Sequence, residues 1–490
     1  MKTINIREIV GENGSPNIYV DPSQKDFSKK APALLADEIA KTGIIVFDDT
    51  DAHIRTQTHY QRITDKNIPR LIPQLLDPSI RTQIPTSCIT ECVKRLTLLP
   101  ELQTDLTEEF WKNQNLLNLQ NGVYDIMTQQ LRERKPEDKF NYILNFNYQP
   151  NCKLDDVSCF KKFLETSLDE EGSRCLLFVL AYCLSSLTQA EKAFILLGNA
   201  KTGTSTILNL LQSVTSPDLV SNEPFHLMGS ERSKAKYTGK RINISRENSS
   251  IPMKHEDSFK SLISNEETYG RNLYESGKYF QPPVKFIFAF NGEPNFTNPD
   301  DAIYDKMIVI PFNKEIKLED RDIDLGKEMI ENKDIIFSII IDNLKELVES
   351  GYDFHESKEA KEYIQQHRTF LHSVEDFLDE NTVLDAHSGI SSTELNKLYE
   401  EWCHANNIPA IGRNYFYKHI RDYSKEIQYG KVVSRNGRVN GFNGLRIKSK
   451  EEMDAFYASN FQTQSNSDVA SDIATDSESS MLTNLETTTE

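Results

Sequence analysis

The stretch Phe194-Ile-Leu-Leu-Gly-Asn-Ala-Lys-Thr-Gly-Thr-Ser-Thr-Ile-Leu-Asn-Leu-Leu211 decides the fold expected for the central part of this 490-residue chain. Its apolar start, residues 193–197, predicts a buried strand, and the apolar spacing of residues 207–211 predicts a helix. A G-x-x-x-x-G loop joins them, as in a phosphate-binding loop, where backbone N–H groups and the helix N-terminus face a polyphosphate. The predicted nucleotide-binding residues are Gly198, Asn199, Ala200, Lys201, Thr202, Gly203, Thr204, Ser205 and Thr206.

One residue of this loop departs from the pattern. Thr204 stands where a phosphate-binding loop has the lysine that reaches the β- and γ-phosphates. Threonine is uncharged and too short for that contact, and the nearest cation, Lys201, could swing over instead. The hydroxyl of Ser205 or Thr206 could hold Mg²⁺.

Composition limits the class of protein. The chain holds 74 acidic and 56 basic residues, a net charge of −18, which excludes a generally basic DNA-coating protein but allows a local basic face. The sequence shows no secretory signal pattern and no apolar run as long as a bilayer span, so we expect a cytoplasmic chain of two to four domains without membrane contact. Its seven scattered cysteines read as reduced core thiols rather than a metal site.

Strands and helices alternate from residue 190 to about 320, which predicts an α/β fold with a parallel sheet. The strand at 241–245 is followed by Glu247, whose carboxylate could orient the attacking water or help Ser205 hold a metal. The strand at 284–290 is followed by Asn291, which is placed to sense the γ-phosphate. Strand 307–312 is expected to close the sheet.

The segments before this block read as smaller units. From residue 59 onward the pattern turns helical, and Asn121-Gly122 predicts a β-hairpin over 116–125. Residues 152–187 read as helices that lead into the strand at 193–197. They could act as a collar or lid, and simple packing explains them equally well. Residues 230–237 are a short basic stretch, typical of a solvated helix face.

After amphipathic helices at 322–370, the C-terminal pattern of helices and a β-turn-β predicts a winged helix. Residues 411–450 hold ten Lys or Arg against two Asp or Glu, which favours a DNA surface over the alternative of protein contacts. Residues 451–490 contain no Lys or Arg and predict a disordered acidic tail. The predicted DNA-binding residues of this region are Arg413, Lys418, Arg421, Arg435 and Arg438.

The order of these pieces resembles the superfamily 3 (AAA+-type) helicase domain of phage and plasmid primase–helicases, which poxvirus primase–helicases share. The resemblance covers roughly residues 55 to 445. The motifs that carry it are the loop at 198–206, the strand ending in Glu247, Phe259-Lys-Ser-Leu-Ile263, Gly270-Arg271-x-x-Tyr274, Phe288-x-x-Asn291-x-x-Pro294, Ile308-x-Ile-Pro-Phe312 and, upstream, Asn118-x-x-Asn121-Gly-Val-x-Asp125.

The resemblance implies an ATP- and Mg²⁺-dependent DNA helicase of a phage, plasmid or genomic island, acting as a homo-hexameric ring on single-stranded DNA while the winged helix binds duplex origin DNA. It assigns catalytic roles to Glu247, Asn291 and Lys306, the last standing where the family usually has an arginine that reaches the neighbour's nucleotide. It also places Lys278 and Tyr279 on a DNA-contacting hairpin, although an ordinary exposed turn explains them equally well.

The expected domains are a mainly helical pre-helicase α+β domain (1–150), a helical collar (151–190), the ATPase domain (191–370), the winged helix (371–450) and the tail (451–490). Three functions remain open at this point. Beside the helicase, Thr204 and Lys306 favour a hydrolysis-deficient ring-forming initiator or loader. The third is a transcriptional regulator acting through the winged helix.

Overall fold

The computed structural model describes residues 16–48, 51–63, 67–106, 112–248, 251–271, 277–281, 283–297, 299–314, 316, 322–408, 410–434 and 437–456. The chain forms two compact units, Met1–Glu362 and Tyr363–Glu490, and each is considered by itself. The predictions for Arg435 and for residues 457–490 of the acidic tail lie outside the described residues.

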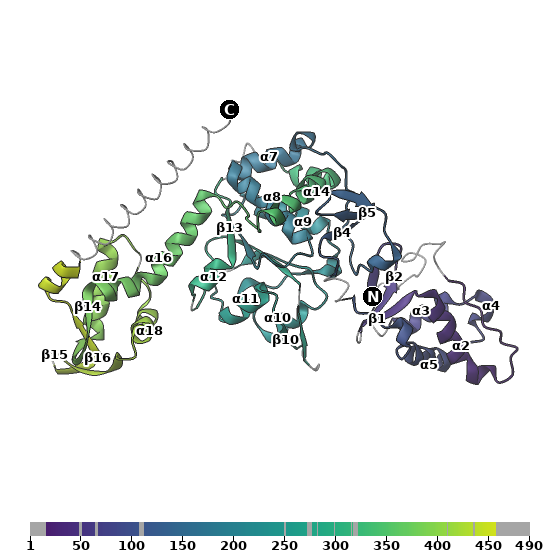
Figure 1. Cartoon of the computed structure of the whole chain (residues 1–490), viewed down its shortest axis with the longest axis horizontal. Coiled ribbons are helices and arrows are strands. Elements are labelled where there is room, and N and C mark those ends of the chain that lie inside the picture. Colours follow the sequence, from purple (N-terminus) through teal and green to yellow (C-terminus); the bar gives the residue numbers. More distant parts are fainter. Residues whose placement is uncertain are drawn as a thin grey trace, which may run out of the picture. The chain divides into compact units, whose positions relative to one another are not determined.

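A five-stranded parallel sheet lies at the centre of the first unit, as the alternating pattern predicted (Figure 1). Its order is β13-β7-β12-β9-β8, so β13 closes one edge. Every residue of β12 is buried, which explains the continuous apolar run, because helices cover parallel sheets on both faces. The strands are β7 (Ala193–Leu197), β8 (Val220–Ser221), β9 (Ile242–Asn248), β12 (Lys285–Phe290) and β13 (Met307–Pro311).

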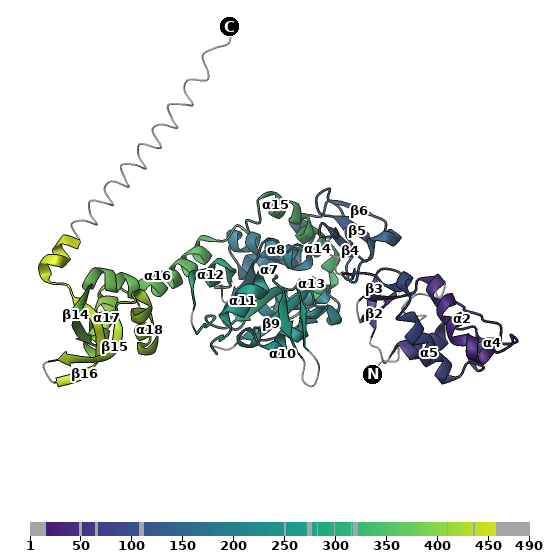
Figure 2. The same cartoon turned by 60° about the horizontal axis from the view of Figure 1, so that its bottom comes forward.

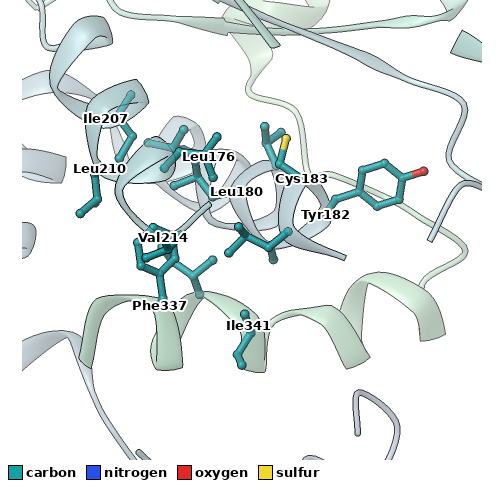
Figure 3. Packing of buried hydrophobic residues seen from close by; sticks show 14 of the residues in the cluster. Leu176, Leu180, Tyr182, Cys183, Ile207, Leu210, Val214, Phe337 and Ile341 are labelled. Carbon is teal, nitrogen blue, oxygen red and sulfur yellow. The ribbon is translucent and has the colours of Figure 1, made fainter. Parts of the chain in front are cut away.

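Helices α7 (Ser158–Ser167), α8 (Glu170–Leu184), α9 (Thr204–Ser213), α13 (Leu325–Glu331) and α14 (Lys333–Asp342) pack around this sheet. Leu180 of α8, Leu210 of α9 and Phe337 of α14 meet in one fully buried cluster (Figure 3). Burying such a side chain contributes about 1.5–3 kcal/mol, so this cluster holds α9, and with it the loop that precedes it, in place.

Shorter elements surround the strands. They are α10 (Glu231–Lys236), α11 (Glu256–Ile263), α12 (Asp301–Asp305), α15 (Leu344–Glu349) and the antiparallel pair β10 (Thr268–Gly270) and β11 (Lys278–Phe280). Single 3₁₀ turns lie at Pro100–Leu102, Pro136–Asp138, Leu154–Asp156, Pro217–Leu219 and Phe225–Leu227. No helix in the described ranges is both long enough and apolar enough to cross a membrane.

The N-terminal part corrects one prediction. Residues 59–63, expected to begin a helical region, contain strand β3, because Ala52 of β2 pairs with Ile63 in an antiparallel sheet. Helical spacing begins only at Ile68. The hairpin predicted over 116–125 is confirmed by the antiparallel pairing of β4 and β5. The elements here are α2 (Phe27–Thr42), β1 (Ile45–Asp48), β2 (Asp51–Arg55), β3 (Tyr60–Ile63), α3 (Ile68–Leu75), α4 (Pro78–Arg81), α5 (Thr86–Leu96), β4 (Leu116–Leu119), β5 (Gly122–Asp125) and β6 (Gln130–Arg132).

In the second unit, helices α16, α17 and α18 pack with a three-stranded antiparallel sheet of order β14-β16-β15 (Figure 2). Its core stacks the rings of Tyr399 and Phe416 with centroids 4.3 Å apart. The predicted helices and hairpin are present, whereas strand β14 was not anticipated from the sequence. The elements are α16 (Lys358–Asn381), β14 (Thr382–Ser391), α17 (Ser392–Ala405), α18 (Arg413–Tyr423), β15 (Gln428–Ser434) and β16 (Gly437–Ile447).

Candidate nucleotide-binding site

The predicted phosphate-binding loop leaves β7 and enters α9, and both of its glycines are required by the local packing. A Cβ on Gly198 would lie 2.7 Å from Cβ of Phe312, and Gly203 adopts a φ of 101° as the N-cap of α9. A Cβ on Gly203 would also lie 2.8 Å from Oγ of Ser167. Larger residues at either position would therefore displace the loop from the sheet or from α7.

The side chains of the loop are divided between its interior and the solvent. Thr204, at the position of the missing lysine, is only 8% exposed, and the buried Thr202 donates from Oγ1 to the Asn199 carbonyl at 2.9 Å. Lys201 and Ser205 are exposed. Lys201, at a φ of 74°, is thus the loop's own cation, and within the described part of the chain it has no ion pair.

A cavity of about 740 Å³ opens beside the loop. Its volume falls in the range of small-ligand sites, about 300–1,000 Å³. Lys201 and Thr206 reach it from the loop side, and Phe163 of α7 forms part of an apolar wall. Lys162 lines the same cavity and forms an ion pair with Asp322 at 2.8 Å. The remaining lining residues are Thr166, Gly203, Asn209, Ile316, Ile323, Leu325, Gly326, Lys327, Ile330 and Glu331.

The register of the sheet brings the positions of Glu247 and Asn291 to the loop. Phe290 of β12 lies opposite Leu197 of β7 and opposite Asn248 of β9. Glu247 and Asn291 therefore adjoin these positions at the carboxyl edge of the sheet, where the phosphate-binding loop begins. Asn291 is exposed, while the side chain of Glu247 lies outside the described residues.

A buried amide that the sequence analysis did not single out holds this edge together. Asn248 donates from Nδ2 to the Ala289 carbonyl at 2.9 Å, and its Oδ1 accepts from the Phe225 N–H at 2.9 Å and from Ser245 Oγ at 3.0 Å. It joins the strand of Glu247 to the strand of Asn291. In the sequence, only the position of Asn248 directly after Glu247 points to this role.

Lys306 lies at the other edge of the sheet. Its carbonyl accepts from the N–H of Ala193, the first residue of β7. At about 3.3 Å per residue, the five residues of β7 separate it from Gly198 by roughly 16 Å. Its Nζ lies 2.9 Å from Oε2 of Glu191 and also donates to Ser264, and this ion pair lowers the pKa of the Glu191 carboxyl. Within one chain, Lys306 is not brought together with the other predicted catalytic positions.

The hairpin predicted to contact DNA is present as strands β10 and β11. Tyr279 is 68% exposed, and its ring lies 5.2 Å from that of Tyr269 on the paired strand. The backbone of Lys278 belongs to β11, while its side chain lies outside the described residues. Of the two residues predicted to contact DNA here, Tyr279 is therefore the one whose side chain is described and accessible to a ligand.

In the second unit, α18 and the β15–β16 hairpin are joined by aromatic contacts. The rings of Tyr417 on α18 and Tyr429 on β15 lie 6.0 Å apart. Four of the predicted residues are described: Arg413, Arg421 and Arg438 are exposed, and Lys418 is partly buried. Two further residues of β15, Tyr429 and Lys431, are exposed on this unit and were not predicted to bind DNA. They alternate along the strand with positions such as the buried Val432, and this alternation is the sequence pattern that indicates their exposure.

Two families match the chain. The family described as D5 N terminal like matches residues 33–168, and a family of unknown function (DUF5906) matches residues 196–304. A protein of Acanthamoeba polyphaga mimivirus named as a helicase is 24% identical over 258 residues, which make up 50% of this chain and 26% of the mimivirus protein. The chain therefore spans about a quarter of that relative's length.

Two solved apo structures of the NrS-1 C-terminal region cover 84% of this chain and 99% of their own, at 13% and 14% identity and TM-scores of 0.45 and 0.47. The D5 N terminal like match includes the upstream hairpin at 116–125, and the DUF5906 match includes the loop at 198–206. These matches support a relationship of the chain to phage and viral primase–helicases.

Proposed function

We propose that this protein is an ATP-dependent, helicase-like replication protein of a phage, plasmid or genomic island that acts as a ring on DNA. The observation that carries the proposal is the 740 Å³ cavity beside the phosphate-binding loop. The loop itself leaves β7 at the carboxyl edge of the sheet, where the strands of Glu247 and Asn291 also end. Ligands of parallel α/β sheets bind at this carboxyl edge. The proposed fold of this unit is an AAA+-type, superfamily 3 ATPase domain.

The proposed roles follow from position. Backbone N–H groups of the loop and the N-terminus of α9 bind the phosphates of ATP, and Lys201 supplies the charge that Thr204 lacks. Ser205 and Glu247 hold Mg²⁺, and Asn291 orients the attacking water at the γ-phosphate. The base and ribose occupy the cavity between α7 and α13, against the ring of Phe163. Lys306 acts only on the nucleotide of a neighbouring subunit, because its own lies too far away.

The second unit is proposed to be a winged helix that binds duplex DNA. Its order, α16-β14-α17-α18-β15-β16, supports this reading, with α18 as the helix that enters the major groove. The exposed Arg413, Arg421 and Arg438 fit a phosphate-contacting face. We propose that the chain divides into the five domains and segments expected from the sequence, 1–150, 151–190, 191–370, 371–450 and 451–490.

Two observations favour a second candidate, a ring-forming initiator or loader that binds DNA without hydrolysing ATP. Thr204 is buried and cannot supply a charge, and Lys306 is held by Glu191 of its own chain. Both features weaken hydrolysis without weakening assembly on DNA.

ATP binding and hydrolysis, with and without single-stranded DNA, separate the candidates when measured on the native protein, Lys201→Ala and Thr204→Lys. Turnover in the native protein that is lost in Lys201→Ala establishes the motor with its substituted lysine. Turnover only in Thr204→Lys establishes the non-hydrolysing candidate. Absence of nucleotide binding in all three contradicts the proposed function.

A further inference from the structure

Ser167, the last residue of α7, carries a buried hydroxyl that lies against the phosphate-binding loop. Its side chain is 0% exposed, and its Oγ has no hydrogen-bond partner among the described residues. A serine hydroxyl can donate one hydrogen bond and accept two, so leaving it unpaired away from water destabilises the folded protein. A buried polar group in this condition is expected to find its partner in another state of the protein.

The hydroxyl lies next to the residue that begins α9. A Cβ on Gly203 would lie 2.8 Å from Oγ of Ser167 and 2.9 Å from Cε2 of Phe163, so α7 touches the loop backbone at this point. Gly203 is the N-cap of α9 and has no side chain that could bond the free N–H groups of the first helical turn. Those N–H groups are the ones proposed to bind phosphate. Ser167 therefore lies beside the part of the loop that would contact a nucleotide.

The end of α7 is fixed in this position by the strand that also supports the loop. Lys314, which follows β13, donates from Nζ to the carbonyls of Glu165 at 3.0 Å and Leu168 at 2.6 Å. Phe312, just after the same strand, packs so closely on Gly198 that a Cβ there would lie 2.7 Å from its own Cβ. The helix end and the loop thus share one support, which keeps the hydroxyl beside the loop.

We propose that Ser167 is a positioning residue of the nucleotide site, whose hydroxyl forms a hydrogen bond with the loop backbone at Gly203 when a polyphosphate binds. The bond that the ligand-free protein leaves unmade then favours the bound arrangement of the loop, since a ligand shifts an equilibrium only through interactions that differ between the two states. The proposal rests on the proposed nucleotide site and does not depend on ATP hydrolysis. It gives α7 a part in nucleotide binding beyond simple packing.

The test compares Ser167→Ala with Ser338→Ala in the full-length chain. Both serines are 0% exposed, but Ser338 Oγ is paired, because it donates to the Asp334 carbonyl at 2.6 Å and accepts from the Gln149 N–H at 2.8 Å. The measurements are the affinity for mant-ATP, the affinity for tripolyphosphate as its competitor, and the urea midpoint of the ligand-free protein.

We expect Ser167→Ala to weaken the binding of both ligands roughly 2- to 12-fold, the equivalent of one hydrogen bond, while its urea midpoint stays or rises. We expect the opposite pattern for Ser338→Ala, a lower urea midpoint with unchanged affinities, because it breaks bonds that the ligand-free protein already makes.

Three results would overturn the proposal. They are an unchanged affinity in Ser167→Ala, a urea midpoint lowered as much as in Ser338→Ala, and weaker mant-ATP binding with unchanged tripolyphosphate binding, which would place the hydroxyl at the base or ribose. Lys201→Ala separates this proposal from the proposed function. If the native protein binds neither ligand, the nucleotide site fails and the role of Ser167 fails with it. If binding is weakened by Lys201→Ala and untouched by Ser167→Ala, the role of Ser167 alone is wrong.

Discussion

Lys306 and Glu191 form an ion pair of 2.9 Å at the amino edge of the central sheet, the edge opposite to the phosphate-binding loop. The lysine is 18% exposed and also donates to Ser264, so its position is defined by its own chain. If ATP binds at the loop as proposed, a residue in this place reaches a nucleotide only across a subunit boundary.

Lys306→Ala therefore separates binding from turnover. We expect the ATP affinity of the dilute protein to stay unchanged, because the residue lies roughly 16 Å from its own loop. In the assembled protein we expect turnover to fall by about 10³-fold or more, the magnitude associated with a charge supplied in trans. Steady-state hydrolysis as a function of protein concentration, with Glu191→Gln as the control that keeps the lysine, checks this. A lower ATP affinity in the dilute variant would contradict the geometry.

Asn248→Ala tests the buried amide that joins β9 to β12. Removing it leaves the Phe225 N–H and the Ala289 carbonyl without their hydrogen bonds, which costs about 1–3 kcal/mol of the free energy of unfolding. Because Asn248 directly follows Glu247, we also expect slower ATP turnover. Urea unfolding and hydrolysis assays measure the two effects. Asn332→Ala, which removes an exposed amide at the junction of α13 and α14, is the control and should lower stability less than Asn248→Ala does. An equally small effect at Asn248 would show that the link is dispensable.

Lys285 gives the first unit a pH-dependent stability. This lysine is 4% exposed, with Nζ 5.1 Å from the ring centre of Tyr182, and burial together with the charge of Arg241 lowers its pKa to about 7. Between pH 7 and about 10, the unfolded chain binds more protons at this site than the folded chain, so stability rises with pH in this window.

Lys285→Met should remove that dependence. We expect the variant to be more stable than the native protein at pH 7 by up to about 4 kcal/mol, with the difference shrinking to about 1 kcal/mol at pH 9.5. Urea unfolding at both pH values measures it, and Lys29→Met provides an exposed lysine for comparison. A variant less stable than the native protein at pH 7 would show that the contact with Tyr182 outweighs the cost of burial.

Arg413→Ala/Arg421→Ala tests the proposed duplex-binding face of α18. If both arginines contact phosphates, duplex affinity should fall at every sequence, and the slope of log K against log salt should drop by about 1.8, or 0.9 per contact. Lys397→Ala, an exposed lysine on α17, is the matched control. Unaltered duplex binding in the double variant would favour the alternative of a protein-contacting winged helix.

Local patterns in the sequence were sufficient for much of the fold. The strand, loop and helix around Gly198, the hairpin at Asn121-Gly122 and the parallel sheet follow from apolar periodicity and turn residues that act over a few positions. Residues 59–63 were misread because their strand depends on pairing with β2, and pairing partners do not appear in a local window. The sheet edge shared by Glu247 and Asn291 could be anticipated, since parallel strands end on the same side.

The sequence by itself determined which residues are available for phosphate binding, and only the tertiary structure decided which of them share a place. Strand order and crossovers put Lys306 at the opposite edge from its own loop, and the Cβ-free surface of Gly270 set α10 against the hairpin of Tyr279. Likewise Lys285, which reads as a polar start to an apolar strand, lies buried beside the ring of Tyr182, and the charge of Arg241 acts on it. Residue type fixes the chemistry that a side chain can perform, whereas distance and burial depend on contacts between segments far apart in the chain.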